Sequence, residues 1–235
     1  MSGPAISAAF FDPQGDVHAS LRSGMGVIFR GERPEIVDGP PELARDGAGW
    51  SLRIAREVEL TFEPVSEEGS LGGSTARLCR VRGRVGQDAL DCLGTVTETT
   101  QAPAWDELDA TRSISAIFDA AHALVLFARR PRGARGHGEE ELTGWLLEDG
   151  VLHGIEDARL STIYDGEGRQ RSSGLELWLP GEDFPRRAAG EARAGLSLAL
   201  EGLIVHAAVF GWRMEGRDGV GAYELSVRDE GGVAA

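Results

Sequence analysis

Apolar and polar residues alternate along much of this chain with a period of two. Residues 57–62 read Glu-Val-Glu-Leu-Thr-Phe, which places every apolar side chain on one face of an extended strand. Residues 17–22 and 175–179 alternate in the same way. Only residues 104–110 and 186–194 predict a turn or two of helix. The pattern therefore predicts an all-β protein with very little helix.

Turn-forming residues separate the alternating segments. The chain holds 33 glycines among 235 residues, about twice the usual share of ~7%. Residues 12–15, Asp-Pro-Gln-Gly, suit a type I turn. Asp-Gly pairs, which favour tight turns, occur at 38–39, 46–47, 149–150, 165–166 and 218–219. Short strands joined by such turns are typical of an antiparallel sandwich or barrel.

The chain divides into two similar halves. About sixteen strands are expected, split evenly near Pro103. Residues 6–12 match residues 114–119, and residues 83–91 match residues 216–224. Chance similarity between hairpins of biased composition explains either match alone, whereas two matches in the same order favour an internal duplication.

Two copies of eight antiparallel strands predict two tandem β-barrels packed together. We expect an N-terminal barrel over residues 1–103 and a C-terminal barrel over residues 104–235. A barrel of about eight strands has room for side chains or for one small ligand. A ligand cavity is therefore expected inside one barrel or between the two.

The N-terminus lacks the basic and apolar regions of a secretory signal. The most apolar long stretch, residues 194–212, is interrupted by Glu201, His206 and three glycines. It fits two buried strands joined by a turn better than a membrane helix, which needs about 20 apolar residues. We expect a cytoplasmic protein without a membrane span, as a monomer or a homodimer.

The chain holds two cysteines, Cys79 and Cys92. A hairpin centred on residues 85–86 would place them opposite each other, within disulfide range. The alternative, which we favour, is a pair of reduced thiols in the core of a cytoplasmic protein.

Charge and composition exclude several classes of function. The net charge is −14, and a chain this acidic repels phosphate backbones, so no nucleic-acid partner is expected. All 24 basic residues are arginine, and the chain contains no lysine or asparagine. These absences exclude Schiff-base catalysis, a Walker-type phosphate lysine and N-glycosylation. The five histidines show no metal-ligand spacing, so neither a metal nor another cofactor is expected.

One basic segment, residues 129–137, reads Arg-Arg-Pro-Arg-Gly-Ala-Arg-Gly-His. It lies between two strand patterns, which predicts a hairpin loop. It is a candidate for attracting an acidic partner or a phosphate. The alternative is a mobile loop whose charge is balanced by the three glutamates at 139–141.

The last strands carry a family resemblance. Residues 211–225 contain a glycine-rich pattern that ends in Gly-Ala-Tyr-Glu, and this hairpin resembles the C-terminal hairpin of the hydroxyneurosporene synthase (CrtC)/AttH-like family. Residues 144–150 and 162–168 resemble middle hairpins of the same family. The resemblance is clearest over residues 90–229. In the segment 101–107, where many relatives have a His-Ser-Trp-Gly-like tract, only the tryptophan is retained.

The resemblance implies two lipocalin-like barrels and a chemistry of carotenoid hydration or of terpenoid or Diels–Alder-type cyclisation. Such reactions on an alkene need a neutral acid beside an apolar cavity, and aromatic faces that stabilise a developing cation. The candidate catalytic acids at the junction of the two halves are Glu98, Asp106 and Asp109. The alternative for each is an exposed linker carboxylate.

The candidate ligand-binding residues lie around the same junction and in the last hairpin. Trp105 and Trp145 are candidate π-faces, and Arg112 is a candidate to hold a carboxylate or a polar ligand tail. The resemblance makes Glu224 a candidate that faces the cavity, and Tyr223 beside it is a further candidate for ligand binding. The alternative for Glu224 is a salt bridge that closes the barrel.

Three hypotheses follow. The first is a cofactor-independent hydratase or cyclase that acts on an apolar, polyene-like small molecule. The second is a lipocalin-like carrier that binds a hydrophobic small molecule without reaction. The third is a structural or interaction protein with a filled core. The residues that line the cavity discriminate among them.

Overall fold

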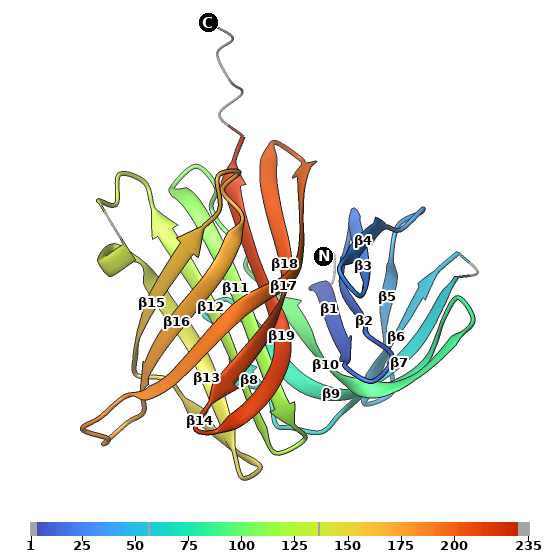
Figure 1. Cartoon of the computed structure of the whole chain (residues 1–235), viewed down its shortest axis with the longest axis horizontal. Coiled ribbons are helices and arrows are strands. Elements are labelled where there is room, and N and C mark those ends of the chain that lie inside the picture. The colour runs from blue at the N-terminus through green and yellow to red at the C-terminus, as the bar shows by residue number, and fades with distance from the viewer. Residues whose placement is uncertain (1–3, 56, 136, 230–235) are drawn as a thin grey trace, which may run out of the picture.

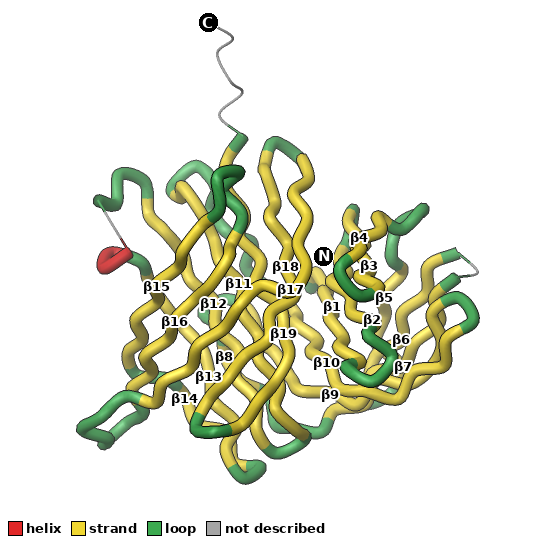
Figure 2. The backbone as a smooth tube through the Cα atoms, viewed as in Figure 1, coloured by secondary structure: helices red, strands yellow, loops and turns green. Residues whose placement is uncertain are grey.

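The computed structural model describes residues 4–55, 57–135 and 137–229, and these are almost entirely strand (Figures 1 and 2). In this part of the chain the one helix is a 3-10 turn, η1 (His137–Glu139). The helix expected over residues 186–194 is wrong, because this segment lies in β17 (Arg186–Leu200) and pairs with a strand on each side. Tertiary pairing overrides its alanine-rich composition. Residues 104–110 form a turn closed by the Glu107 amide to Ala104 O at 2.9 Å, and a strand starts at Leu108.

The first sheet is built from the first half of the chain. Its strands are β1 (Ala5–Asp12), β2 (Val17–Arg22), β3 (Met25–Arg30), β4 (Arg33–Ile36), β5 (Glu42–Asp46), β6 (Gly49–Ile54), β7 (Val58–Pro64), β8 (Gly69–Ser70), β9 (Ser74–Val85) and β10 (Asp88–Thr99). The pairing order is β4-β3-β2-β1-β10-β9-β7-β6-β5, and β8 pairs with β9. Every pair is antiparallel.

The second sheet is built from the second half. Its strands are β11 (Leu108–Asp119), β12 (His122–Pro131), β13 (Glu141–Glu148), β14 (Val151–Gly154), β15 (Asp157–Tyr164), β16 (Gln170–Trp178), β17, β18 (Leu203–Met214) and β19 (Arg217–Arg228). The pairing order is β14-β13-β12-β11-β19-β18-β17-β16-β15. The stretch 194–212 is thus two strands joined by a turn, as predicted. None of the helices in the described part of the chain has the length and apolarity needed to cross a bilayer.

The two sheets share one topology. The order of the second sheet repeats that of the first, with β11 in the place of β1 and β19 in the place of β10. The segments 83–91 and 216–224, which resemble each other in sequence, form the equivalent β9–β10 and β18–β19 hairpins. This is the arrangement that an internal duplication predicts.

The predicted all-β architecture is confirmed in the form of two curled antiparallel sheets, each a half-barrel (Figure 1). Within the described residues the strands number nineteen rather than about sixteen, because short strands such as β4, β8 and β14 join the sheets. In the described part of the chain, the edge strands β4 and β5, and likewise β14 and β15, are not paired with each other. The division into domains at residue 103 stays a prediction.

Three apolar clusters hold the molecule together. Trp50, Phe62 and their neighbours pack inside the first sheet, and Phe210, Trp212 and Tyr223 pack inside the second. The Phe210 and Trp212 rings stack with centroids 5.3 Å apart. A third cluster lies between the sheets, and it buries residues from both: Phe11, Val27, Phe29, Leu78, Val125, Trp145, Val205 and Val209. Burial of apolar area between the two sheets therefore fixes how one sheet lies against the other.

Trp145 is fully buried in the cluster between the sheets and packs against Gly69 of β8. A Cβ atom at Gly69 would come within 2.0 Å of Trp145 Cδ1. Only a residue without a side chain allows the two sheets to approach this closely.

The cysteine register differs from the one needed for a disulfide. Cys79 stands opposite Gly94, and Cys92 stands opposite Val81. The turn is centred one position further along the chain than the sequence suggested, so both cysteines are free. Burial raises the pKa of each thiol to about 12, as expected of unreactive thiols.

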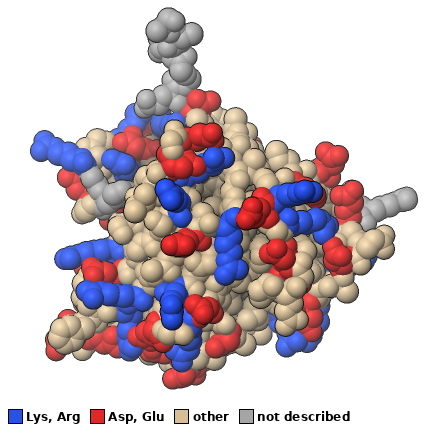
Figure 3. Space-filling model, in the orientation of Figure 1, with Lys and Arg blue, Asp and Glu red and all other residues tan. Residues whose placement is uncertain are grey.

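Charged side chains of both signs are mixed over the face shown in Figure 3. On the outer face of the first sheet, arginines pair with carboxylates of neighbouring strands. Arg80 contacts Asp91 at 2.6 Å, and Arg82 contacts Glu63 at 2.8 Å. Such exposed pairs contribute little stability.

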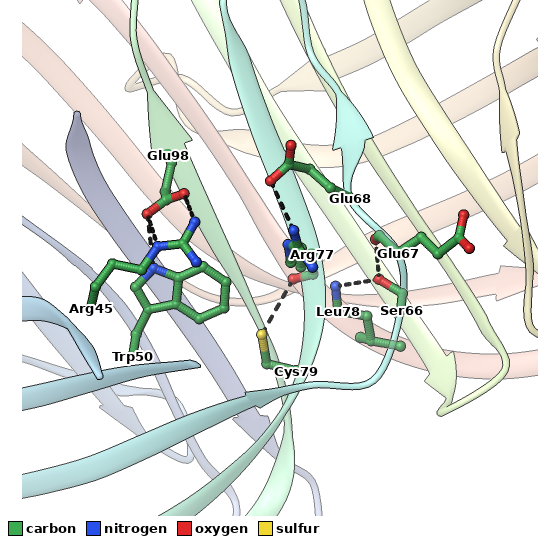
Figure 4. Close-up of polar contacts among 9 residues, drawn as sticks. All are labelled: Arg45, Trp50, Ser66, Glu67, Glu68, Arg77, Leu78, Cys79 and Glu98. Atoms are coloured by element: carbon green, nitrogen blue, oxygen red, sulfur yellow. Dashed lines mark hydrogen bonds and ion pairs between the residues drawn. The ribbon is translucent and has the colours of Figure 1, made fainter. Parts of the chain in front are cut away.

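Glu98 forms an internal ion pair in the first sheet (Figure 4). Its carboxylate accepts hydrogen bonds from Arg45 Nε at 2.8 Å, from Arg45 Nη2 at 2.5 Å and from Trp50 Nε1 at 3.0 Å. The bonds from Arg45 and Trp50 lower the pKa of Glu98 against the opposing effect of burial. Three donors aimed at one carboxylate favour its ionised form.

Gly69→Ala should lower the free energy of unfolding by about 1–3 kcal/mol, because the new methyl group overlaps the Trp145 ring. Gly154→Ala is the matched control. Gly154 of β14 stands opposite Trp145 of β13, but a Cβ added there meets no atom within 4 Å. The free energy of unfolding of this variant should therefore change by less than about 0.5 kcal/mol. Urea denaturation measures both. Equal stability of the two variants would contradict the close approach of the sheets.

Glu98→Gln should destabilise the protein more at neutral pH than in acid. A carboxylate with a lowered pKa contributes stability above its unfolded pKa of about 4.3, and this contribution is lost as the pH falls through the folded value. The difference in unfolding free energy between wild type and Glu98→Gln should therefore shrink on titration from neutral pH to about pH 3. Urea denaturation across this range measures it, and a constant difference would be evidence against the ionised Glu98.

Candidate functional site

A cleft of about 410 Å³ lies between the two sheets. One wall consists of β1, β2 and β10, and the other consists of β11, β12 and β19 (Figure 1). The connection 101–105, the turn between β17 and β18, and Leu71 and Ser74 near the start of β9 also line it. The cleft is therefore formed by the central strands of both sheets, where the two copies of the fold meet.

The alternation of the strands places a row of hydroxyl groups on each wall. Thr95, Thr97 and Thr99 of β10 face the cleft, while the residues between them face the interior of the first sheet. Ser113 and Ser115 of β11 line the opposite wall. Apolar lining comes from Ile6, Leu71, Val125, Phe127 and Leu203. The cleft thus combines an apolar surface with many weak hydrogen-bonding groups.

An ion pair crosses the cleft. Glu224 of β19 lines it and accepts a hydrogen bond from Arg22 Nη1 of β2 at 2.7 Å. The Ser20 hydroxyl donates to the other carboxylate oxygen at 3.4 Å. Glu224 thus lies in the cleft lining, and its salt bridge joins the two sheets instead of closing one barrel.

Trp105 also lines the cleft, half-buried at the end of the connection between the sheets. The neighbouring candidates do not. Asp106 is exposed beside it, and Asp109 Oδ2 accepts a hydrogen bond from the Gly133 amide at 3.2 Å. These carboxylates therefore lie outside the cleft lining, and Asp109 holds the turn that follows β12.

Arg112 and Tyr223 point into the second sheet and not into the cleft. Arg112 Nη1 lies 2.5 Å from Glu140 Oε1, and its Nη2 donates to the Tyr164 hydroxyl at 3.2 Å. The Tyr223 hydroxyl lies 2.7 Å from Thr162 Oγ1, and burial raises the Tyr223 pKa. Arg112, with its side chain 3% exposed, is thus committed to a buried ion pair inside the second sheet.

Two further candidates are placed away from the cleft. Trp145 is buried against Gly69 between the sheets, and Glu98 lies inside the first sheet with Arg45. The three donors around Glu98 favour its ionised form, whereas protonation of an alkene needs a neutral acid. Of the residues selected from the sequence, the structure brings Trp105 and Glu224 together at the cleft.

Sequence reasoning missed the hydroxyl rows and assigned one arginine of the cleft to a loop. The run Thr-Val-Thr-Glu-Thr at 95–99 carries a period-two signal for a polar strand face, so this row was detectable. Arg129 of the basic segment also lines the cleft, because β12 extends to Pro131 instead of ending before the arginines. Among the described residues, no cluster of three or more His, Cys, Asp or Glu side chains is placed to hold a metal ion.

Comparisons with known proteins relate this geometry to known folds. No family model and no curated protein matches the sequence. A crystal structure of a putative AttH from Nitrosomonas europaea matches with a TM-score of 0.64 and 13% identity over 95% of this chain and 92% of that chain. Kievitone hydratase from Nectria haematococca matches with a TM-score of 0.59 and 8% identity over 96% and 89%. The chain thus has the two-domain β fold of these two AttH-like and hydratase structures.

Proposed function

We propose that this protein binds a small, largely apolar organic molecule in the cleft between the sheets and acts on it there as a cofactor-independent hydratase or cyclase. The observation that carries the proposal is the cleft itself. Its volume of about 410 Å³ falls within the range of small-molecule sites, which are mostly apolar with a few placed polar groups. The fold that the chain shares with kievitone hydratase supports the reaction class.

In this proposal Glu224 moves the proton of a hydration. The proposal concerns a double bond activated by conjugation, for which an ionised carboxylate serves as the base and the neutral acid that an isolated alkene requires is not needed. The Glu224 carboxylate accepts a proton from water as the water oxygen bonds to one carbon of this double bond. The proton then passes to the neighbouring carbon, so that one water is added and the carboxylate is restored. Arg22 and Ser20 hold the carboxylate in place. A pericyclic cyclisation needs only the orientation that the cleft walls supply.

The second candidate is a carrier without catalytic activity. The observation that favours it is the partnering of Glu224, whose two oxygens are occupied by Arg22 and Ser20. A carboxylate that only links the two sheets through this ion pair takes no part in a reaction. The two candidates share the cleft and differ in what Glu224 does, so they are separated by turnover and not by binding.

Ser113→Trp should block the cleft. Ser113 is exposed on the cleft wall in β11, so an indole placed there extends into the cavity, and the strand tolerates tryptophan. The affinity for the methyl ester of cis-parinaric acid, a neutral fluorescent polyene, should fall more than about tenfold in a fluorescence titration. Thr61→Trp, on the outer face of β7, is the control and should bind as wild type. Unchanged binding by Ser113→Trp would place the ligand elsewhere.

Glu224→Gln should lower the rate of hydration by about 100-fold or more, within the range of general acid–base catalysis. Arg22→Met is the matched control, because it breaks the same ion pair and leaves the carboxylate. Turnover is measured with kievitone as the probe, by mass spectrometric detection of a product heavier by one water. Loss of turnover in Glu224→Gln alone supports proton transfer by Glu224. An equal loss of turnover in both variants indicates that Glu224 serves only to link the two sheets. Binding of kievitone by the wild-type protein without turnover supports the carrier.

A further inference from the structure

The alternation of β12 places Arg129 in the cleft. Val125, Phe127 and Arg129 are two residues apart, and all three line it. Ala128 and Arg130 point to the other face of the strand, and Arg130 Nη2 donates to Ala134 O at 3.2 Å. The arginines at the start of the basic segment therefore lie on opposite faces of β12, and Arg129 belongs to the proposed site.

Two neighbours hold the Arg129 side chain in position. Its guanidinium carbon lies 5.5 Å from the centre of the Phe127 ring, an arrangement that favours a cation over the ring. Its Nη2 donates to Gly72 O. A Cβ at Gly73 would lie 3.2 Å from the same Nη2, so the glycine turn closely fits the guanidinium. Both neighbours limit the motion of the side chain before any ligand binds, which lowers the entropic cost of binding.

Among the described residues, Arg129 has no carboxylate partner, whereas Arg22, which also lines the cleft, pairs with Glu224. Arg112, which points into the second sheet, pairs with Glu140. Glu141 stands opposite Arg129 in the β12–β13 register, yet within residues 4–229, except 56 and 136, no carboxylate oxygen lies within 4.0 Å of the Arg129 guanidinium. With 38 acidic residues against 24 basic ones, the chain does not lack carboxylates. The guanidinium carries five N–H donors, and the bond to Gly72 O uses one of them.

The cleft that Arg129 lines also carries polar groups that accept or donate hydrogen bonds weakly. Ser74, two residues after Gly72, donates its hydroxyl to Thr99 Oγ1 at 3.0 Å, and both line the cleft with Gln101. An Arg fork beside hydroxyl groups matches the planar pair of oxygens of a carboxylate. The remaining lining is the apolar surface already described, which matches a hydrocarbon body.

We propose that the ligand of the cleft is an amphipathic carboxylic acid, whose carboxylate binds Arg129 and whose apolar body extends between the hydroxyl rows of β10 and β11. This inference rests on the proposed function, because it names the class of molecule that the same cleft takes. It assigns to Arg129 the role that the sequence suggested for Arg112, which is occupied by Glu140. The net charge of −14 does not oppose it, since the charge of distant carboxylates is screened beyond about 8 Å at physiological salt.

The test compares cis-parinaric acid with its methyl ester, two probes that differ in one negative charge. Wild-type protein should bind the acid about tenfold or more tightly than the ester, as expected for a hydrogen-bonded charge pair. Arg129→Met should remove this preference and leave the affinity for the ester within about twofold. Arg129→Lys should keep part of the preference. Arg130→Met, on the opposite face of the same strand, is the matched control and should keep all of it.

The outcomes separate this inference from the proposed function. Equal affinity of wild type for acid and ester, with binding still blocked by Ser113→Trp, would overturn the role of Arg129 and retain the cleft. Binding of neither probe, or binding that Ser113→Trp leaves unchanged, would overturn both. Displacement of the acid by inorganic phosphate but not by acetate would assign the site to a phosphate and refute the carboxylic acid. The comparison on wild type requires no variant to fold.

Discussion

The central strands of this molecule pack into their own sheet on one face and border the other sheet or the cleft on the other face, and the rest of the structure depends on this constraint. In β10, Val96 and Glu98 face the interior of the first sheet, while Thr95 and Thr97 face the second sheet. In β11, Ile114 points into its own sheet and Ser113 into the cleft. A strand with one face in water tolerates any polar residue on that face. Here each alternate position must suit either a packed interior or a shared boundary.

The boundary between the sheets is accordingly part packing and part cleft. Apolar side chains around Trp145 and Gly69 bring the sheets together at one place. Where β10 and β11 carry hydroxyl groups, the sheets stay apart and leave a lined cavity. The Arg22–Glu224 ion pair joins residues 202 positions apart in the chain across this cavity. The same contact region thus supplies both the stability of the two-sheet arrangement and the space for a ligand.

Much of the fold was predictable because strand and turn signals are local. Alternation indicated the strands, and the paired segments 6–12 and 114–119 indicated the repeat that the topology shows. Four of the five Asp-Gly pairs lie at turns or loops, whereas the pair at 218–219 lies within β19, because the turn before this strand comes at residues 215–216. The β17 strand was missed over its first residues, because alanine-rich sequence favours helix until pairing with β16 and β18 is known. The pattern within one segment of the sequence does not identify the strands with which that segment pairs.

The site was less predictable because it depends on which face each residue takes. Arg112 and Ser113 are adjacent, yet the first is committed to Glu140 and the second lines the cleft. Glu98 was selected for its position at the junction, and its partner Arg45 lies 53 residues away. The sequence pattern assigned Arg129 to a loop. It lines the cleft because β12 extends further along the chain than this pattern indicated.

The most direct test of ligand binding between the two sheets is the structure of a crystal of this protein soaked with cis-parinaric acid. We expect electron density for the polyene between Thr97 and Ser113, in the cleft that the two sheets share. Density inside either sheet, among the side chains around Trp50 or around Trp212, would contradict it.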